Sequence, residues 1–320
     1  MINSQPSTSL YRHGGQTNLA ADITKLASKQ TYYTFRFLVR RQRVHDAFRS
    51  YAYFRWVDDQ LDCNTGTQLE KLAFIHRQLE LLDACYAGEA HTPVCPEEQM
   101  LVDLVENNPE KTNGVQIYLR NMMAVMVFDV QRKGRMIAQA ELTHYSQMLS
   151  VAVTELLFYF IGNETKSPSG EERYQAVRGA HIAHMLRDML GDIDLGYINI
   201  PAEILEAHRV SLNDPGSPAF RMWVMERVRL AHHCFNIGRK YFIQVKNLRC
   251  RLAAYAYLAR FEWMLVLITR DGYRLRRTYP ERKSLRAGVW MVWRVFSSLL
   301  NISIPKTSDR EILLSESRKE

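Results

Sequence analysis

The sequence predicts an all-α protein built as one large helical bundle, and three observations support this fold class. Apolar residues recur at helical spacing almost everywhere from about residue 20 of this 320-residue chain. Strict alternation over the length of a strand is hard to find. The chain has only 15 Gly and 10 Pro, which leaves room for long uninterrupted helices. Because no repeat and no shift in composition marks a boundary, we expect one domain over residues 19–304, between polar tails at 1–18 and 305–320.

The expected helices lie between segments rich in Gly, Pro, Asn, Ser and Thr, the residue types that end helices. These breaks fall at residues 64–66, 87–96, 107–113, 163–170 and 207–218. The segments between the breaks carry their apolar residues at helical spacing. In chain order, we expect helices over residues 31–62, 67–86, 97–106, 114–133, 139–162, 170–195, 217–248, 250–271 and 281–303. Several of these helices are apolar enough to pack inside a bundle.

Composition and charge exclude disordered and collagen-like chains. Apolar residues make up 47% of the chain and charged residues 24%, close to globular averages. The formal net charge is +8, from 42 Lys and Arg against 34 Asp and Glu. A basic chain favours an anionic partner, which could be a diphosphate, an acidic membrane surface or a nucleic acid. Charge alone does not choose among them.

The cysteines and the N-terminus favour a cytoplasmic location. The five cysteines are odd in number and none forms a C-x-x-C pair, so a disulfide framework or a zinc ribbon is not expected. The first fifteen residues are polar and lack the apolar core of a secretion signal. No uncharged apolar stretch reaches the roughly 18 residues of a membrane span. The sequence does not indicate an oligomeric state.

The segment from Gly288 to Ile304 has two interpretations. It is apolar and is interrupted by Arg294. It could lie in a membrane interface, with Trp290 and Trp293 at the level of the headgroups and neighbouring Arg and Lys facing lipid phosphate. It could also be an ordinary terminal helix packed on the core. We favour the packed helix, because its apolar residues are no denser than those of other core helices, and peripheral membrane association stays open as the alternative.

The first of two aspartate clusters lies in residues 51–62, which read YAYFRWVDDQLD. Residues four apart share one face of a helix, so Asp58 and Asp62 point the same way. Arg55 lies one turn earlier on this face, and Tyr51 lies one further turn along. Most of the other residues are apolar. Carboxylates in an apolar helix are costly unless they are paired or bind a metal.

The second cluster lies in residues 181–192, which read HIAHMLRDMLGD. Asp188 and Asp192 share a helix face, and His184 and His181 continue this stripe towards the N-terminus. Arg187 is adjacent to Asp188. Two such helices facing each other would bring several carboxylates to one cavity.

Hard oxygen ligands in that arrangement suit Mg²⁺, which keeps part of its water shell and bridges to substrate phosphates. Arg55 and Arg187 could grip the same phosphate oxygens in a fork. The chemistry that this predicts is the loss of diphosphate from an allylic prenyl ester, because metal ions and arginines neutralise the leaving group. An apolar bundle interior would then keep a carbocation away from water.

Two other interpretations of the clusters remain. The aspartates could lie on solvated helix faces that carry Asp–Arg pairs, although two clusters amid apolar residues favour a metal site over this. A di-iron carboxylate bundle would need Glu-x-x-His pairs and inward Glu residues, and none is found.

These motifs resemble those of the squalene/phytoene synthase family, which joins two prenyl diphosphates head to head. Residues 51–62 resemble the family motif Y-A-x-x-R-x-x-D-D-x-x-D, and residues 186–192 (LRDMLGD) resemble its L-R-D-x-x-x-D. The resemblance covers residues 25–285. Weaker similarities, in the same order as in the family, lie at residues 28–35, 128–130, 141–145 and 272–283.

The resemblance implies an isoprenoid synthase fold, a single all-α bundle with a deep central cavity. It implies catalytic aspartates that hold Mg²⁺, with Mn²⁺ as a possible substitute, and a farnesyl or geranylgeranyl diphosphate substrate rather than a nucleic acid. The positions that match metal ligands are Asp58, Asp62, Asp188 and Asp192. Those that match contacts to the substrate are Ser28, Lys29, Tyr51, Arg55 and Arg187, and we add His181 and Phe261 as further candidates.

The chain departs from the family pattern around the second motif. The family's Q-x-x-N is here His181-x-x-His184, and a histidine at 184 would offer nitrogen to the metal, which Mg²⁺ accepts poorly and Mn²⁺ accepts better. His184 could instead donate a hydrogen bond to diphosphate, and both histidines could simply be satisfied polar groups of the bundle. Phe261 replaces a common Tyr. The segment 195–201 (LGYINIP) lacks the two Arg of the family's flap, and residues 150–154 (SVAVT) replace its A-G-T-V-G, which should reshape the cavity.

Because the first motif is intact and the second is altered, three functions stay open. The first is head-to-head synthesis. One substrate ionises, and the double bond of the second attacks its C1 cation to give a cyclopropylcarbinyl diphosphate. This intermediate then ionises and rearranges to a linear product. The second is a diverged enzyme that ionises one prenyl diphosphate and cyclises, hydrates or transfers it. The third is a non-catalytic assembly protein, which retained carboxylates argue against. No G-x-G-x-x-G opens a helix, so a reductive step with a nicotinamide cofactor is unsupported.

Overall fold

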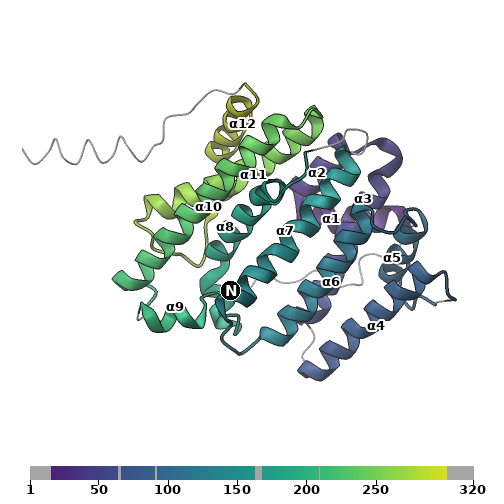
Figure 1. The fold of residues 1–320 in the computed structure, drawn as a ribbon, viewed down its shortest axis with the longest axis horizontal. Helices are drawn as coiled ribbons and strands as arrows, with labels where there is room; N and C mark the ends of the chain where they lie inside the picture. The colour runs from purple at the N-terminus through teal and green to yellow at the C-terminus, as the bar shows by residue number, and fades with distance from the viewer. Residues whose placement is uncertain (1–15, 64–65, 91, 163–167, 209, 301–320) are drawn as a thin grey trace, which may run out of the picture.

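The computed structural model describes residues 16–63, 66–90, 92–162, 168–208 and 210–300. All regular structure in these residues is helical, as the sequence predicts, and none of it is strand (Figure 1). The first six α-helices are α1 (Gln16–Ala27), α2 (Lys29–Leu38), α3 (Val44–Cys63), α4 (Gln68–Ala87), α5 (Pro96–Glu106) and α6 (Gly114–Arg132). The other six are α7 (Gln139–Gly162), α8 (Glu172–Asp194), α9 (Ala202–Ala207), α10 (Pro218–Gln244), α11 (Leu248–Arg270) and α12 (Leu285–Leu299). Two short 3₁₀ helices are η2 (Arg41–Arg43) and η3 (Pro280–Lys283).

Most expected helices are found within a few residues of their predicted ends, but the one expected over 31–62 is wrong. It is divided into α2, η2 and α3. Val39 and Val44 on either side of the break are both buried. Five residues apart on one continuous helix, they would point about 140° away from each other, so the break lets both reach the core. No Gly or Pro marks this break, and the turn signals in the sequence therefore missed it.

Two further helices were not predicted. Helix α1 begins at Gln16, three residues before the expected start of the domain, and it packs against α3. Its buried Thr24 hydroxyl donates to the carbonyl of Ala20. Helix α9 has only six residues, too few to show a periodic pattern. The rest of the predicted N-terminal tail and the whole predicted C-terminal tail lie outside the described residues.

Helix α8, which carries the second aspartate cluster, lies in the middle of the bundle between α7, α10 and α11 (Figure 1). It packs most extensively against α10, and two glycines allow the close approach. A Cβ atom on Gly179 would lie 2.9 Å from the carbonyl oxygen of Ala231, and one on Gly238 would lie 2.9 Å from the Cα atom of Ala176. The first cluster lies on α3, which packs against α1 and α5.

Helix α11 is the one described helix that is long and apolar enough to cross a membrane by length and composition, a feature that the sequence analysis did not identify. However, 67% of its most apolar window is buried inside the bundle, so α11 is a core helix. Its Glu262 is buried and forms ion pairs with Arg239 of α10 and Arg294 of α12.

Helix α12 is packed on only one side, so the expectation of an ordinary core-packed helix is half wrong. On the packed side, Ala287 and Ser297 are buried and the ring of Trp290 lies 5.3 Å from that of Trp263. On the other side, six large apolar side chains are exposed. They are Leu285, Val289, Val292, Trp293, Phe296 and Leu300. Periodicity shows that a helix has an apolar face, but it does not show whether another element covers that face.

Candidate active site

The first aspartate cluster lies at the C-terminal end of α3. Ala52, Tyr53 and Val57 are fully buried and anchor one face of the helix in the core. The opposite face therefore presents Asp58, whose side chain is 42% exposed, together with Asp62.

Arg55 lies within this cluster and already has carboxylate partners. Its Nη1 atom lies 3.0 Å from Oδ2 of Asp58, and its Nε atom donates to Asp59 over 3.2 Å. The guanidinium is thus held on the side of α3 that carries the carboxylates, as the i, i+3 and i, i+4 spacings predict.

The pKa of Asp58 is raised to about 7, chiefly by burial and by the nearby charge of Asp62. The ion pair with Arg55 only partly offsets these effects. The pKa of Asp62 is also raised by burial, against the opposing effect of Arg55. A carboxyl group whose pKa is raised by neighbouring carboxylates lies in a region of excess negative charge. Such a place favours the binding of a cation.

In the second cluster, Asp188 lies between Arg187 and His184. Arg187 Nε donates to Asp188 Oδ1 over 2.6 Å, and His184 Nε2 lies 3.0 Å from Asp188 Oδ2. Burial disfavours the ionised form of Asp188, but the hydrogen bonds from His184 and Arg187 outweigh it and hold the pKa well below its usual range. Burial lowers the pKa of His184. The imidazole is therefore neutral at neutral pH, with Nε2 directed at Asp188.

Asp192, one helical turn further on, behaves oppositely. Its pKa is raised to about 6 by burial and by the charge of Asp188. Asn199, from the segment after α8, donates a hydrogen bond to Asp192 over 2.8 Å. Asp58 and Asp62 of the first motif and Asp192 of the second thus have raised pKa values, whereas the pKa of Asp188 is lowered by its hydrogen bonds.

Asp129 of α6 connects the two motifs, and the sequence analysis did not name it as a site residue. Its negative charge raises the pKa of Asp58 and that of Asp192, and the charge of Asp62 raises the pKa of Asp129, which burial has already increased. Acids of α3 and α8 therefore both interact electrostatically with Asp129. A shared metal-binding space between the two clusters stays a prediction.

A cation from α6 supports the segment that follows α8. Arg132 donates to Asp129 and to Asn199, each over 2.6 Å, and its guanidinium carbon lies 5.0 Å from the centre of the Tyr197 ring. Burial and the charges of Asp62 and Asp129 raise the pKa of Tyr197 to about 12. The flap segment lacks its own arginines, and Arg132 brings a positive charge to it from another helix.

A group of arginines lies beside Asp188. Arg260 of α11 and Arg282 of η3 each have a lowered pKa, because burial and the positive charge of Arg187 disfavour a further cation there. Tyr51 of α3 adjoins this group: its pKa is raised by burial, opposed by the charges of Arg55 and Arg260. Several arginines that repel one another next to a cluster of acids form a place where a polyanion and its cations can be bound together.

The other predicted substrate residues have different surroundings. The Ser28 hydroxyl caps α2 by accepting from the backbone N–H of Thr31 over 3.3 Å, and it is hydrogen-bonded to Tyr51. Lys29 is exposed, and within the described part of the chain no hydrogen bond or ion pair joins it to the site. Phe261 is buried, with its ring 6.2 Å from that of His184.

His181 is buried on the same stripe of α8, one turn before His184. Its ring packs against Tyr145 at 5.2 Å. Burial lowers its pKa to about 3, so the imidazole is neutral. Among the described residues, its Nε2 atom has no hydrogen-bond partner.

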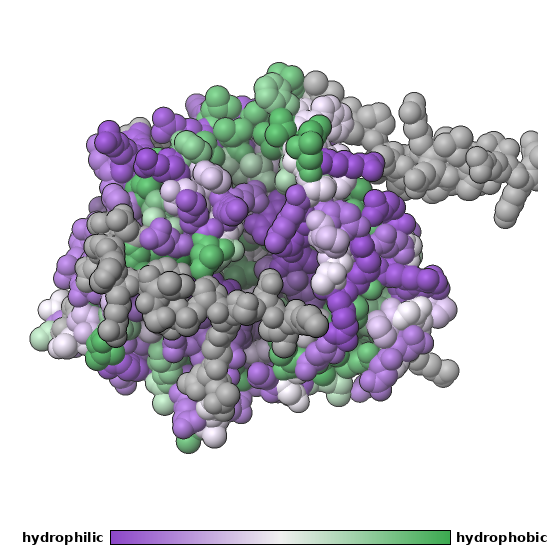
Figure 2. Space-filling view, turned by 180° about the vertical axis from the view of Figure 1, so that it is seen from behind, coloured by the Kyte–Doolittle hydropathy of each residue, from purple (hydrophilic) through white to green (hydrophobic). Residues whose placement is uncertain are grey.

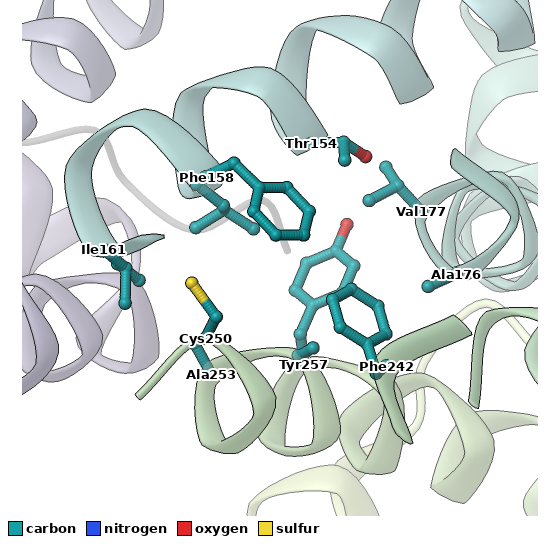
Figure 3. Close-up of a pocket in the computed structure, with 11 residues that line it drawn as sticks. Thr154, Phe158, Ile161, Ala176, Val177, Phe242, Cys250, Ala253 and Tyr257 are labelled. Atoms are coloured by element: carbon teal, nitrogen blue, oxygen red, sulfur yellow. The ribbon is translucent and has the colours of Figure 1, made fainter. Parts of the chain in front are cut away.

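An apolar hollow continues from these residues along the bundle. The space in it, with adjoining open solvent included, is about 380 Å³, and it is lined from four helices by Thr154, Leu157, Phe158, Ile161, Ala176, Val177, Phe242, Cys250, Ala253, Ala254 and Tyr257. Figure 3 shows Tyr257 rising from α11 into this space, with its hydroxyl directed towards Thr154 and Val177. Val177 and Asp188 share one stripe of α8 and lie eleven positions apart, about 16 Å along the helix. The charged group and the hydrocarbon-lined space are thus arranged end to end.

A comparison with protein families identifies the chain. Residues 24–287 match the model of the squalene/phytoene synthase family. The chain belongs to the squalene/phytoene synthase family. This confirms the resemblance that the two aspartate motifs carry, and it gives the bundle the isoprenoid synthase fold.

Solved structures agree with this fold. The squalene synthase HpnC from Alicyclobacillus acidocaldarius is 22% identical and superimposes with a TM-score of 0.65, covering 82% of this chain and 96% of that one. A dehydrosqualene synthase in complex with ligand is 16% identical, with a TM-score of 0.70, covering 89% of this chain and 97% of that one. Among curated proteins, none matches the sequence.

The donor set of this family member fits divalent cations in its chemistry. The carboxylates of Asp58, Asp62 and Asp192 are hard oxygen ligands, and the raised pKa values show uncompensated negative charge around them. Within the described residues, however, no three acidic, histidine or cysteine side chains converge on one point as ligands. Asp188 and His184 are turned towards each other. Metal ligation by these four aspartates and by His184 therefore stays a prediction.

Proposed function

We propose that this chain condenses two prenyl diphosphates head to head, with divalent cations, Mg²⁺ in the first place, assisting the loss of diphosphate. The observation that carries the proposal is the coupling of Asp58, Asp62 and Asp192 through Asp129, next to a group of arginines and at one end of an apolar hollow. Family membership supports prenyl transfer as the class of reaction. The substrates are farnesyl or geranylgeranyl diphosphate.

In this proposal the arginines bind the leaving group. Arg187, Arg260 and Arg282 would give charge-assisted hydrogen bonds to diphosphate oxygens, which relieves their mutual repulsion. Tyr51, with a hydroxyl oriented by Ser28, would add a neutral donor. Mg²⁺, held by Asp58, Asp62, Asp188 and Asp192, would supply positive charge to the departing oxygens.

The hollow holds the isoprenoid chain and excludes water from the cation. Its walls are almost entirely hydrocarbon and aromatic, so the C1 cation of one substrate would meet the double bond of the second before it meets solvent. The intermediate would be a cyclopropylcarbinyl diphosphate, and a second ionisation would rearrange it to a linear product.

A second function, hydration or cyclisation of a single prenyl diphosphate, is favoured by one observation. The Thr154 hydroxyl and His181 Nε2 are buried and have no hydrogen-bond partner among the described residues. Thr154 lines the hollow, and His181 lies one turn of α8 from Val177, which also lines it. Unpartnered polar atoms at an apolar wall could hold a water molecule near the cation. A purely structural role is disfavoured. A carboxyl with a raised pKa, such as that of Asp58, lowers the stability of the folded protein, and a protein that binds no cation gains nothing from it.

Incubation with Mg²⁺ and a panel of prenyl diphosphates, followed by diphosphate measurement and mass analysis of the extract, tests the proposal. A hydrocarbon of doubled carbon number supports condensation, and a product of unchanged carbon number supports the second function. Asp62→Asn and Asp188→Asn should each reduce turnover by more than about 100-fold while the fold survives, because each removes charge at the metal. Asp194→Asn, which breaks an exposed ion pair with Arg277, is the matched control. Diphosphate release at the wild-type rate in either aspartate variant would contradict the proposal.

A further inference from the structure

The exposed face of α12 is an unusual feature for a terminal helix of a bundle. Its apolar residues Leu285, Val289, Val292, Trp293, Phe296 and Leu300 form one stripe along the full length of the helix, and each is more than half exposed. In Figure 2 hydrophobic side chains gather at the upper edge of the molecule, where Figure 1 places α12. A large exposed apolar patch on a protein chain is typical of a surface that binds another protein, a membrane or an apolar ligand.

The charged residue in the middle of α12 does not lie on its exposed face. Its charged Arg294 points inward and pairs with the buried Glu262 over 2.9 Å. Its buried Ser297 donates to the backbone carbonyl of Arg294. The inner face of α12 thus holds these polar groups beside apolar residues such as Ala287 and Trp290, and large apolar groups also cover its outer face. This is the arrangement expected of a helix whose outer surroundings are less polar than water.

Both ends of the stripe are basic. Lys283 and Arg286 are exposed at its N-terminal end. At the other end, Arg251 donates to the backbone carbonyl of Leu299, and Lys246 and Arg249, within five residues of Arg251 in the sequence, are exposed. Residues 246–300 contain twelve Lys and Arg against three Asp and Glu. Each of these three acids forms an ion pair with an arginine.

We propose that α12 docks on an anionic lipid surface, with its apolar stripe among the acyl chains and the flanking cations at the lipid phosphates. A second copy of the chain fits less well. A helix of 15 residues is about 22 Å long and about 10 Å wide, and a face of that size is well below the roughly 800 Å² per partner of a stable interface. In a symmetric pair the basic ends would also face each other.

The stripe lies close to the candidate active site in the sequence, and docking would therefore bring the site to the lipid surface. This step rests on the proposed function. Leu285 follows Arg282 by three residues, and Arg282 interacts with Arg187 and Arg260 of the candidate active site. The lipid surface would therefore lie beside the arginines that bind diphosphate. A prenyl diphosphate held in a membrane could pass into the hollow without crossing water.

Sedimentation of the full chain with vesicles tests the docking without any need for turnover. We expect binding to phosphatidylcholine vesicles that contain phosphatidylglycerol, and weaker binding to phosphatidylcholine alone. The double variant Val292→Gln/Phe296→Gln should bind about tenfold or more weakly, because it removes two large apolar groups. Leu69→Gln/Met222→Gln removes two exposed apolar groups of α4 and α10 and should bind like the wild type.

Two further measurements separate lipid docking from other roles of α12. Arg249→Gln/Arg286→Gln should weaken binding to the anionic vesicles by roughly fivefold per charge and leave binding to neutral vesicles unchanged. Brominated acyl chains should quench a fluorescence component that disappears in Trp293→Phe.

The proposal is overturned if the wild type stays in the supernatant with anionic vesicles, or if the Val292/Phe296 variant sediments as the wild type does. A lipid-free dimer that this variant converts to a monomer would also overturn it in favour of a self-interface. Vesicle binding by a chain that releases no diphosphate would leave the docking intact and refute the proposed function alone.

Discussion

Replacing Asp58 by Asn should stabilise the metal-free protein and at the same time remove its activity. The reason is that folding places this carboxyl beside Asp62 and Asp129 in a poorly solvated position, which raises its pKa to about 7 from 3.8. The folded protein therefore binds this proton more tightly than the unfolded chain does. The stability of the wild type must fall as the pH rises from about 4 to about 7, and the loss is complete above that range.

A shift of this size corresponds to about 4 kcal/mol at about 1.4 kcal/mol for each pKa unit. Because 42% of the side chain is exposed, solvent screens much of the interaction, and we expect a gain of about 1–2 kcal/mol in the free energy of unfolding. For a chain of this size the midpoint of thermal unfolding should rise by roughly 1–3 °C. Asparagine keeps an oxygen that can accept from Arg55, so little is lost in exchange.

The assay is thermal unfolding at pH 8 in the presence of a chelator, followed by circular dichroism. Asp83→Asn on α4 is the control, since it removes an exposed carboxylate that pairs with Arg120, and it should give no gain. The advantage of the Asp58 variant should shrink towards zero near pH 4, and Mg²⁺ should stabilise the wild type more than the variant. The reasoning is refuted if the variant is no more stable than the wild type at pH 8, or if its advantage is the same at both pH values.

Three other predictions concern the second motif, the flap and the packing of the bundle. His184→Asn should raise Mg²⁺-dependent turnover, because it offers a neutral oxygen in place of a ring nitrogen, and unchanged metal dependence would reject a ligand role for position 184. Arg132→Met should lower the free energy of unfolding in urea by about 2 kcal/mol at pH 8, since it leaves the half-buried Asp129 with only the Tyr145 hydroxyl as a partner. A loss under about 0.5 kcal/mol would speak against this ion pair. Gly238→Leu should lower the free energy of unfolding by about 1–3 kcal/mol in the same assay, because the leucine side chain would meet the backbone of α8. Gly288→Ala, with open space around it, should leave the stability unchanged. Equal effects of the two substitutions would show that the close approach of α8 and α10 is unimportant.

The aspartate motifs could be predicted from sequence because each is local. Asp58 and Asp62 lie one turn apart on a helix, and so do Asp188 and Asp192, so helical spacing alone places each pair on one face. The apolar residues around them indicated that these faces are not simply solvated. That the two faces meet is a prediction, and the electrostatic interaction of Asp129 with Asp58, Asp62 and Asp192 supports it.

The residues that the sequence analysis missed reach the site from other helices. Asp129 and Arg132 lie on α6, Arg260 on α11 and Arg282 on η3. Each lies in a segment with no distinctive spacing of its own, and only the packing of the bundle brings it to the site. The i, i+3 pair of Asp129 with Arg132 is visible in the sequence, but such pairs are common on exposed helices and do not by themselves indicate a site.

The break between α2 and α3 and the outward face of α12 were missed for related reasons. Turn signals depend on Gly, Pro and Asn, and the chain turns between Val39 and Val44 without them because both valines gain burial. An apolar stripe such as that of α12 predicts a covered face, but the covering partner need not be part of the same chain.

The most direct test of the central claim is a crystal structure with Mn²⁺ and a non-hydrolysable prenyl diphosphate analogue, with the metal located by anomalous scattering. We expect anomalous peaks between Asp58 and Asp62 on one side and Asp188 and Asp192 on the other, next to diphosphate oxygens that also contact Arg187 and Arg260. The account would be contradicted if the diphosphate bound without metal, or if the metal peaks lay away from both aspartate motifs.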